Sequence, residues 1–129
     1  MVRTGILNPQ INSLLSRVRH TNTLLITDRG FPYWPTIETV DLSLIDNIPR
    51  VLDVLRAIRM NFTIGCIVMA EEFQPHNPPT VVSEFAEAMS GLEVQFEPHA
   101  EFKKRVPQVI GLIRTGDTIQ FANMILESS

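Results

Sequence analysis

The sequence predicts an α/β domain in which helices cover both faces of a mixed β-sheet. Segments with apolar residues at helical spacing alternate with short, β-branched apolar runs along most of the chain. Such alternation favours a layered α/β/α architecture. A length of 129 residues and a hydrophobic content of 44% suit a single domain over residues 1–129.

The first helix and the first strand have clear signals. Asn8 is an N-cap candidate followed by proline, and the apolar stripe after it predicts a helix over Pro9–Arg19. The β-branched, apolar run Thr23–Thr27 predicts a short buried strand. Asp28–Pro35 contains a glycine and two prolines, so we expect a loop there.

The middle of the chain predicts a strand, a helix, a strand and a loop. Alternating polar and apolar residues over Glu38–Leu42 indicate a short strand. Asn47-Ile48-Pro49 repeats the cap-and-proline signal before a helical stripe that reaches Ile58. The nearly continuous apolar run Phe62–Ala70 predicts a central strand that is buried on both faces. Three prolines make Glu71–Pro79 a predicted loop.

The C-terminal part predicts two more helices and a hairpin. A helix over Val81–Ser90 is followed by Gly91 as its C-terminal cap, and Leu92–Phe96 alternates as a strand does. Ala100–Val106 is a predicted short helix that ends before a proline. The last elements are a strand, a turn and a strand, at Val109–Arg114, Thr115–Asp117 and Ile119–Leu126. We therefore expect a C-terminal β-hairpin.

Charge and composition exclude several classes of partner. The 11 basic and 14 acidic side chains give a net charge of −3, so neither nucleic acid nor an anionic membrane is expected as a partner. The longest apolar runs are far too short to cross a bilayer, and the N-terminus lacks the apolar core of a signal peptide. Cys66 is the single cysteine, which excludes an internal disulfide and fits a reducing compartment. We therefore expect a cytoplasmic protein.

Several common catalytic motifs are missing. The glycines form neither of the phosphate-binding patterns, and the sequence contains no G-x-S-x-G. Cys66 lies in an apolar strand, where a thiol is usually inert. Glu72 and His76 have i, i+4 spacing, which converges on a metal ion only in a helix, and the surrounding prolines argue against one. We expect no cofactor and no metal. A metal-dependent enzyme that uses His20, His76 and His99 is the weakest alternative.

The polar candidates for function lie at the ends of elements or in loops, and they are His20, Asp28, His76, His99 and Asn123. His20 either caps the carbonyls of the first helix or acts as an acid–base group. Asp28 ends a strand, where α/β sheets bind ligands, or it stabilises its loop through an Asx-turn. Asn123 lies in an apolar run, so its amide serves either a ligand or neighbouring backbone. His99 is equally compatible with a solvated residue, and His76 with support of a rigid loop.

Six segments, taken together and in order, carry a family resemblance. They are GILNPQINSLLSRVRHTNTL at 5–24, DRGFP at 28–32, AEEFQPHNP at 70–78, HAEFK at 99–103, IRTGD at 113–117 and FANMIL at 121–126. With these segments the chain resembles the D-ribose pyranase / L-fucose mutarotase family nearly end to end.

The resemblance implies an isomerase of carbohydrate metabolism that interconverts ring or anomeric forms of a free monosaccharide, such as ribose or fucose, without a cofactor. It implies a catalytic proton donor at His20 and substrate-binding roles for Asp28, His99 and the segment Phe121-Ala122-Asn123. It also implies a ring-like homo-oligomer, such as a decamer, with sites that involve more than one subunit. The alternative is a non-catalytic sugar-binding or assembly protein of the same fold.

Two residues depart from the family pattern. Phe121 stands where the family usually has tyrosine, so a hydroxyl hydrogen bond worth about 1 kcal/mol is lost. Arg29 stands where a small residue is usual, and its guanidinium can contact an acidic ligand, pair with Asp28 or point outward. These changes leave open which sugar is used, and whether pyranose–furanose or anomer exchange is catalysed.

The positions of His20 and Asp28 lead to a hypothesis about assembly. Histidine suits proton transfer near neutrality because both of its protonation states are available. A straight strand over Thr23–Thr27 spans roughly 17 Å, which is too far for one monosaccharide to bridge. We therefore expect a site that combines His20 of one chain with Asp28 and Phe121–Asn123 of another. A bent or bulged strand is the alternative.

Overall fold

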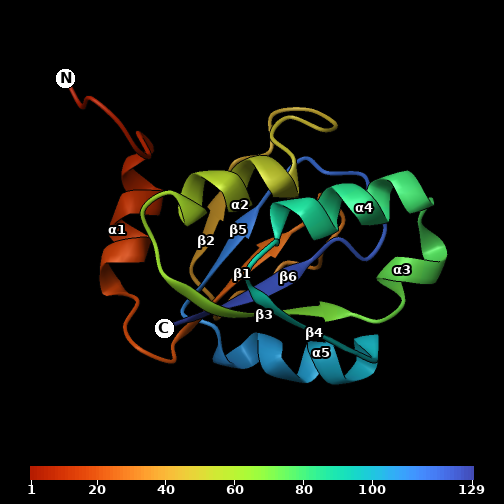
Figure 1. The fold of residues 1–129 in the computed structure, drawn as a ribbon. Helices are drawn as coiled ribbons and strands as arrows, with labels where there is room; N and C mark the ends of the chain where they lie inside the picture. Colours follow the sequence, from red (N-terminus) through yellow and green to blue (C-terminus); the bar gives the residue numbers. More distant parts are fainter.

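The computed structural model describes residues 1–129 and contains one six-stranded sheet with helices on both faces (Figure 1). The strands are β1 (Thr23–Thr27), β2 (Thr39–Asp41), β3 (Ile64–Ala70), β4 (Glu93–Glu97), β5 (Gly111–Arg114) and β6 (Met124–Ser128). The helices are α1 (Pro9–Arg17), α2 (Val51–Arg59), α3 (Phe73–His76), α4 (Pro79–Ala88) and α5 (His99–Arg105), and a 3₁₀ turn follows at Val106–Gln108. The predicted α/β fold with a mixed sheet is confirmed. None of the helices combines the length and the apolar composition needed to cross a bilayer.

The strand directions bring most carboxyl ends of the strands to the same end of the sheet. The strand order is β2-β5-β1-β6-β3-β4. β6 is antiparallel to both β1 and β3, whereas the β1–β5, β2–β5 and β3–β4 pairs are parallel. Every strand except β6 therefore runs in the same direction. Their carboxyl ends meet the beginning of β6 at one edge of the sheet.

The predicted C-terminal hairpin is wrong. β5 and β6 are not neighbours, because β1 lies between them and pairs with both. The connection over residues 115–123 must cross the end of β1, so Ile119–Asn123 forms a loop rather than a strand. Apolar alternation identifies a strand but not its partner, and sequential strands are neighbours in only roughly two-thirds of cases.

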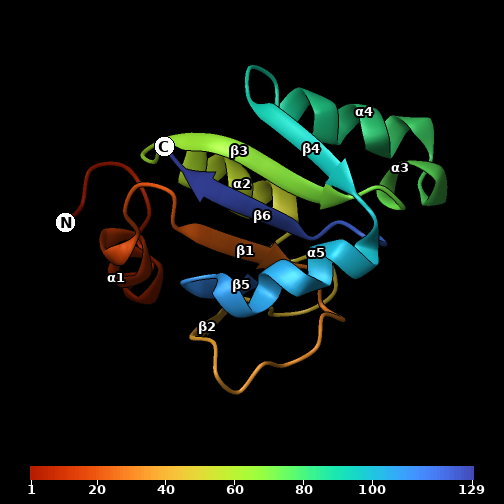
Figure 2. The same ribbon diagram turned by 90° about the horizontal axis from the view of Figure 1, so that it is seen from below.

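Two apolar clusters, one on each face of the sheet, hold the layers together. Leu24 and Ile26 of β1 join the cluster with α1, α2 and α4, whereas Leu25 joins the cluster with α5. Ile67 and Val68 of β3 divide between the two clusters in the same way, although β3 is second from the edge and not central. Figures 1 and 2 show α2 and α4 on one side of the sheet and α5 on the other. Successive residues of β1 and β3 thus point to opposite faces of the sheet, as the two-residue period of a strand requires.

Two predicted boundaries near the functional edge are wrong. The expected loop Glu71–Pro79 contains α3. Pro75 is tolerated because it is the third residue of that helix, where the missing N–H would have no acceptor within the helix. α2 begins at Val51 and is not capped by Asn47. The Asn47 side-chain oxygen instead accepts hydrogen bonds from the N–H and hydroxyl groups of Thr118, at 3.2 and 2.9 Å.

Other boundaries agree with the sequence pattern within a few residues. Asn8 caps α1 by accepting a 2.9 Å hydrogen bond from the N–H of Ile11. α1 ends at Arg17 rather than Arg19, because the backbone of Val18 is extended. Gly91 follows α4 with φ of +81°, a left-handed conformation that favours glycine after a helix.

Candidate functional site

A pocket of about 340 Å³ opens at the edge where the parallel strands end. Its walls come from the loop after β1, from α5 and from the loop before β6, and they comprise Asp28, Gly30, Phe31, Pro32, His99, Lys103, Gln120, Phe121 and Asn123. Open α/β sheets bind ligands at this position, and the volume is at the small end of ligand pockets. Asp28, His99, Phe121 and Asn123 thus lie together. Ala122 does not line the pocket, because its side chain is fully buried in the core.

Asp28 and Asn123 are joined by a hydrogen bond between distant parts of the sequence. The N–H of Asp28 donates to the side-chain oxygen of Asn123 at 2.8 Å. The Asp28 carboxylate accepts the N–H of Gly30 at 3.0 Å, which is the predicted Asx-turn. Asp28 therefore stabilises its own loop and lines the pocket at the same time. The Asn123 side chain accepts a backbone N–H group and, because it also lines the pocket, can contact a ligand.

The environment of Asp28 changes its acidity. Burial raises the pKa of the Asp28 carboxyl group above its ordinary value of 3.8, and the negative charge of Asp117 raises it further. Hydrogen bonds from the N–H groups of Gly30 and Phe31 and from the Asn123 side chain partly offset this increase in pKa. A carboxylate with a raised pKa is a better proton acceptor, so Asp28 can exchange a proton with a bound hydroxyl group.

Replacing Asp28 with asparagine should stabilise the folded chain near pH 7. Because folding raises the pKa of Asp28, the carboxyl group contributes stability below its ordinary pKa of 3.8 and loses that contribution as the pH rises through the folded-state pKa. Asparagine mimics the protonated form and still offers an oxygen to Gly30. Urea unfolding should show a higher midpoint for the variant near pH 7 and no difference near pH 3. A lower midpoint near pH 7 would contradict the burial of this charge.

The wall that contains His99 and Phe121 is supported by α3. The carboxylate of Glu72 accepts the N–H of His99 at 3.0 and 3.1 Å and so caps the first turn of α5. The Phe121 ring lies between the rings of His99 and His76, with centroid distances of 5.2 and 5.0 Å. The backbone of Phe121 has φ of +56°, which is uncommon for a residue with a side chain. These contacts hold Phe121 in that conformation.

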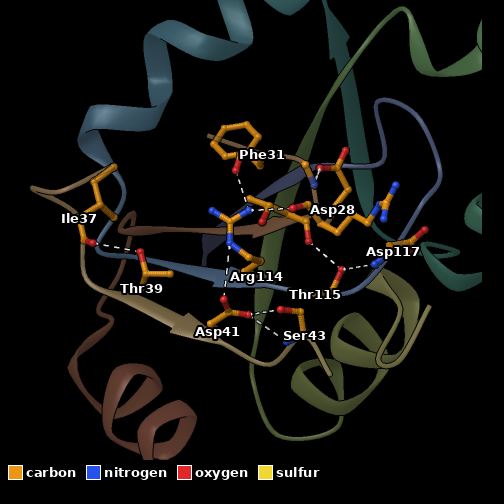
Figure 3. A network of polar contacts seen from close by, with 12 residues as sticks. Asp28, Phe31, Ile37, Thr39, Asp41, Ser43, Arg114, Thr115 and Asp117 are labelled. Atoms are coloured by element: carbon orange, nitrogen blue, oxygen red, sulfur yellow. Dashed lines mark hydrogen bonds and ion pairs between the residues drawn. The ribbon is translucent and has the colours of Figure 1, made fainter. Parts of the chain in front are cut away.

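Two arginines fix the loop after β1. Arg29 points away from the pocket and pairs with Asp46 at 2.8 Å, so it neither pairs with Asp28 nor lines the pocket. Arg114, at the end of β5, donates hydrogen bonds to the carbonyls of Arg29 and Phe31 at 3.2 and 2.6 Å (Figure 3). Arg114 thus holds the segment that begins with Asp28 from the neighbouring strand.

Lys103 and Gln120 line the pocket, and neither is among the residues predicted from the sequence. Lys103 follows His99 by four residues on α5, so the two side chains share a face of the helix. That spacing is visible in the sequence. Gln120 is positioned by Asn77, whose side-chain amide donates to the Gln120 carbonyl at 2.9 Å. No local pattern predicts this contact, because it joins the residue after α3 to the loop before β6.

His20 lies outside this pocket. It is exposed in the turn between α1 and β1, at the opposite end of β1 from Asp28. β1 keeps a continuous register with β5 and β6, so no bulge shortens it, and its span is roughly 17 Å. The carbonyls at the end of α1 are met by Arg19, which donates to Ser16 and Val18. The capping contacts considered for His20 are therefore made by its neighbour Arg19.

The three histidines do not converge within the chain. His76 and His99 lie on either side of Phe121, whereas His20 lies at the far end of β1. No three His, Cys, Asp or Glu side chains form a group that could hold a metal ion. A metal site that uses all three histidines of one chain thus has no supporting geometry.

Known proteins are similar to this sequence over nearly its whole length. The profile of the RbsD / FucU transport protein family matches residues 1–129. A D-ribose pyranase from Geobacillus kaustophilus is 41% identical over 128 residues, which cover 99% of this chain and 93% of that protein. A D-ribose pyranase from Laribacter hongkongensis is 35% identical over 129 residues, which cover 99% of this chain and 97% of that protein.

Solved structures share the fold. RbsD from Bacillus subtilis, complexed with D-ribose, matches with a TM-score of 0.92 and 27% identity over 100% of this chain and 98% of that chain. The fucose mutarotase from Streptococcus pneumoniae, in complex with L-fucose, matches with a TM-score of 0.80 over 95% of this chain and 93% of that chain. At 14% identity this second likeness shows the fold alone. The chain belongs to the RbsD / FucU transport protein family, whose D-ribose pyranases and fucose mutarotases are sugar isomerases.

Proposed function

We propose that the chain interconverts ring or anomeric forms of a free monosaccharide by general acid–base catalysis without a cofactor, with D-ribose as the first candidate. The observation that carries the proposal is the pocket in which Asp28, His99 and Asn123 converge. A carboxylate, an imidazole and an amide can all form hydrogen bonds with sugar hydroxyl groups. D-ribose comes first because the relatives above are D-ribose pyranases, and because RbsD complexed with D-ribose matches the whole chain.

Opening of a sugar ring is a proton-transfer reaction. The bond between the anomeric carbon and the ring oxygen breaks, and its electron pair stays on the ring oxygen, which takes a proton. The anomeric hydroxyl group gives up its proton and becomes the carbonyl group of the open chain. Reclosure by a different hydroxyl group gives the other ring size, and reclosure on the other face gives the other anomer. Acid–base assistance of about 10²- to 10⁴-fold suffices, because the reaction already proceeds in water.

The pocket of one chain supplies the proton acceptor and the groups that bind hydroxyls, but not the proposed proton donor. Asp28, with its raised pKa, is suited to accept the proton of the anomeric hydroxyl group. Asn123 and His99 are placed to fix other hydroxyl groups. The proton donor in the proposal is His20, which can reach such a pocket only from a second copy of the chain. We therefore propose a homo-oligomer with shared sites, for which a ring-like decamer is one arrangement.

We propose that this enzyme works in the cytoplasm. Cys66 is unpaired and half-buried, and burial raises the pKa of its thiol. A thiol of this kind is unreactive and fits a protein that folds without disulfides. It has no part in the proposed reaction.

Saturation-transfer NMR on D-ribose tests the proposed reaction. The protein should speed exchange between pyranose and furanose signals, or between anomers, well above the rate in buffer, and a chelator should leave that rate unchanged. L-fucose and other free sugars in the same assay rank the substrates. Binding without faster exchange would favour a non-catalytic sugar-binding protein. Exchange at the buffer rate for every sugar would refute the enzyme.

A further inference from the structure

The loop between β5 and β6 contains a buried carboxylate that the proposed reaction does not use. Asp117 is 1% exposed and takes part in no ion pair. One of its carboxylate oxygens accepts the N–H of Val51, the first residue of α2, at 2.9 Å, and the other accepts the N–H of Ile119 at 2.9 Å. A buried carboxylate without a cation depends on such hydrogen bonds, and the positive end of the α2 dipole also favours it.

The backbone of Asp117 connects to both chain neighbours of Asp28. Its carbonyl accepts the N–H of Arg29 at 3.0 Å. Its N–H donates to the hydroxyl oxygen of Thr115 at 3.1 Å, and this hydroxyl donates to the carbonyl of Thr27 at 2.7 Å (Figure 3). The residues before and after Asp28 are therefore both tied to the segment around Asp117.

The same loop continues from Asp117 into the pocket wall that lies before β6. The hydrogen bond to Ile119 fixes the beginning of the segment that carries Phe121 and Asn123. Asn123 then returns to Asp28 through the 2.8 Å hydrogen bond from the Asp28 N–H. Asp117 thus connects α2 with two of the three pocket walls, the loop after β1 and the loop before β6, without lining the pocket itself.

We propose that Asp117 is a positioning residue for the ring-opening reaction, because it docks the β5–β6 loop on α2 and so holds Asp28 and Asn123 in the geometry that binds the sugar. This inference rests on the proposed function. Asp117 acts through Asp28 and Asn123 and does not touch the sugar. Its negative charge has a second effect, since it adds to the rise in the pKa of Asp28.

Other charged groups also surround Asp28. They are His99 and Lys103 from α5 and Arg114 from β5, whereas Arg29 of its own loop points away and pairs with Asp46. All of them remain when Asp117 is replaced by an uncharged residue. A change in the titration of Asp28 in such a variant therefore reports the loss of Asp117, through its charge and through the position in which it holds Asp28.

Asp117→Asn tests the proposal with two readouts. Asparagine removes the charge and turns an amide group toward one of the two backbone N–H groups. We expect kcat/KM for D-ribose exchange to fall by about tenfold to a hundredfold, as for other displacements away from the chemistry. The acid limb of its pH profile should move to lower pH, and a ¹³C NMR titration should show a lower pKa for the Asp28 carboxyl group without substrate. If either kcat/KM or the Asp28 titration is unchanged in the folded variant, the proposal fails.

Asp53→Asn is the matched control. The Asp53 carboxylate accepts the N–H of Arg50 at 2.8 Å at the same end of α2, but it does not line the pocket. This variant should lose some stability and keep both readouts. Val51→Pro covers the case in which Asp117→Asn does not fold, because proline is favoured at the first helical position and removes the N–H that Asp117 accepts. It should lower kcat/KM in the same way, and unchanged kcat/KM in Val51→Pro would overturn the proposal.

Failure of this inference is distinguishable from failure of the proposed function. If the wild-type chain does not speed exchange of any sugar, the proposed function is wrong, and the ¹³C titration of Asp28 still decides whether the two carboxylates are coupled. If the wild-type chain is active and Asp117→Asn matches it in kcat/KM, only the positioning role is wrong.

Discussion

Replacing His20 with alanine should lower the rate of sugar ring exchange by about 10²- to 10⁴-fold, which is the range that general acid–base assistance contributes. The fold should be unaffected, because the side chain is exposed and Arg19, not His20, bonds the carbonyls at the end of α1. Saturation-transfer NMR at a fixed protein concentration measures the rate. Light scattering on the same samples checks that the assembly is the same as in the wild type.

Arg19→Ala is the control for this variant. Arg19 is the exposed neighbour of His20 in the same turn, and its loss removes hydrogen bonds to Ser16 and Val18. We expect a small loss of stability and an exchange rate within about twofold of the wild type. If His20→Ala exchanges sugar at the wild-type rate, the proton donor is another group. His99, which lines the pocket, and His76, which contacts Phe121, are then the next histidines to replace.

Most helices and strands follow from local pattern, because each buries a face that local spacing defines, whereas α3 lies in a segment predicted as a loop. Leu24, Leu25 and Ile26 are all apolar since β1 has a helical layer on each side. The partners of each strand do not follow from local pattern. The run Val109–Leu126 has the sequence of a hairpin, yet β1 enters between its two strands. Pairing is decided by how the whole set of strands covers its apolar faces, and no single segment records this.

The site is predictable only in part for the same reason. Asp28 at the end of a strand is a local signal, and His99 and Asn123 are polar candidates to which the family resemblance assigns substrate-binding roles. The capping signal at Asn47 predicts the wrong partner. The Asn47 side-chain oxygen accepts hydrogen bonds from Thr118, whereas the distant Asp117 accepts the first N–H of α2. Hydrogen bonds between residues more than sixty positions apart have no signature in a local window.

Mixing His20→Ala chains with Asp28→Asn chains should restore exchange that neither variant has alone. Asp28→Asn by itself should lose about 10²-fold or more, because the carboxylate that accepts a proton is gone. Within one chain the two residues lie beyond opposite ends of β1, a strand that spans roughly 17 Å. If a site combines both residues from different chains, a random one-to-one mixture rebuilds about a quarter of the sites. Recovery is measured by saturation-transfer NMR after co-expression with two different affinity tags and sequential purification.

The matched control replaces the Asp28→Asn chain with a chain that carries both substitutions. A mixture of His20→Ala with this double variant contains no His20, so its exchange rate should stay at the background level. The shared site requires recovery in the first mixture and none in the second. If the first mixture is no faster than the sum of its parts, or if wild-type monomers are as active as the assembly, His20 and Asp28 do not act in one site built from two chains. The donor would then have to be a group of the same chain, and His99 is the imidazole that the pocket already contains.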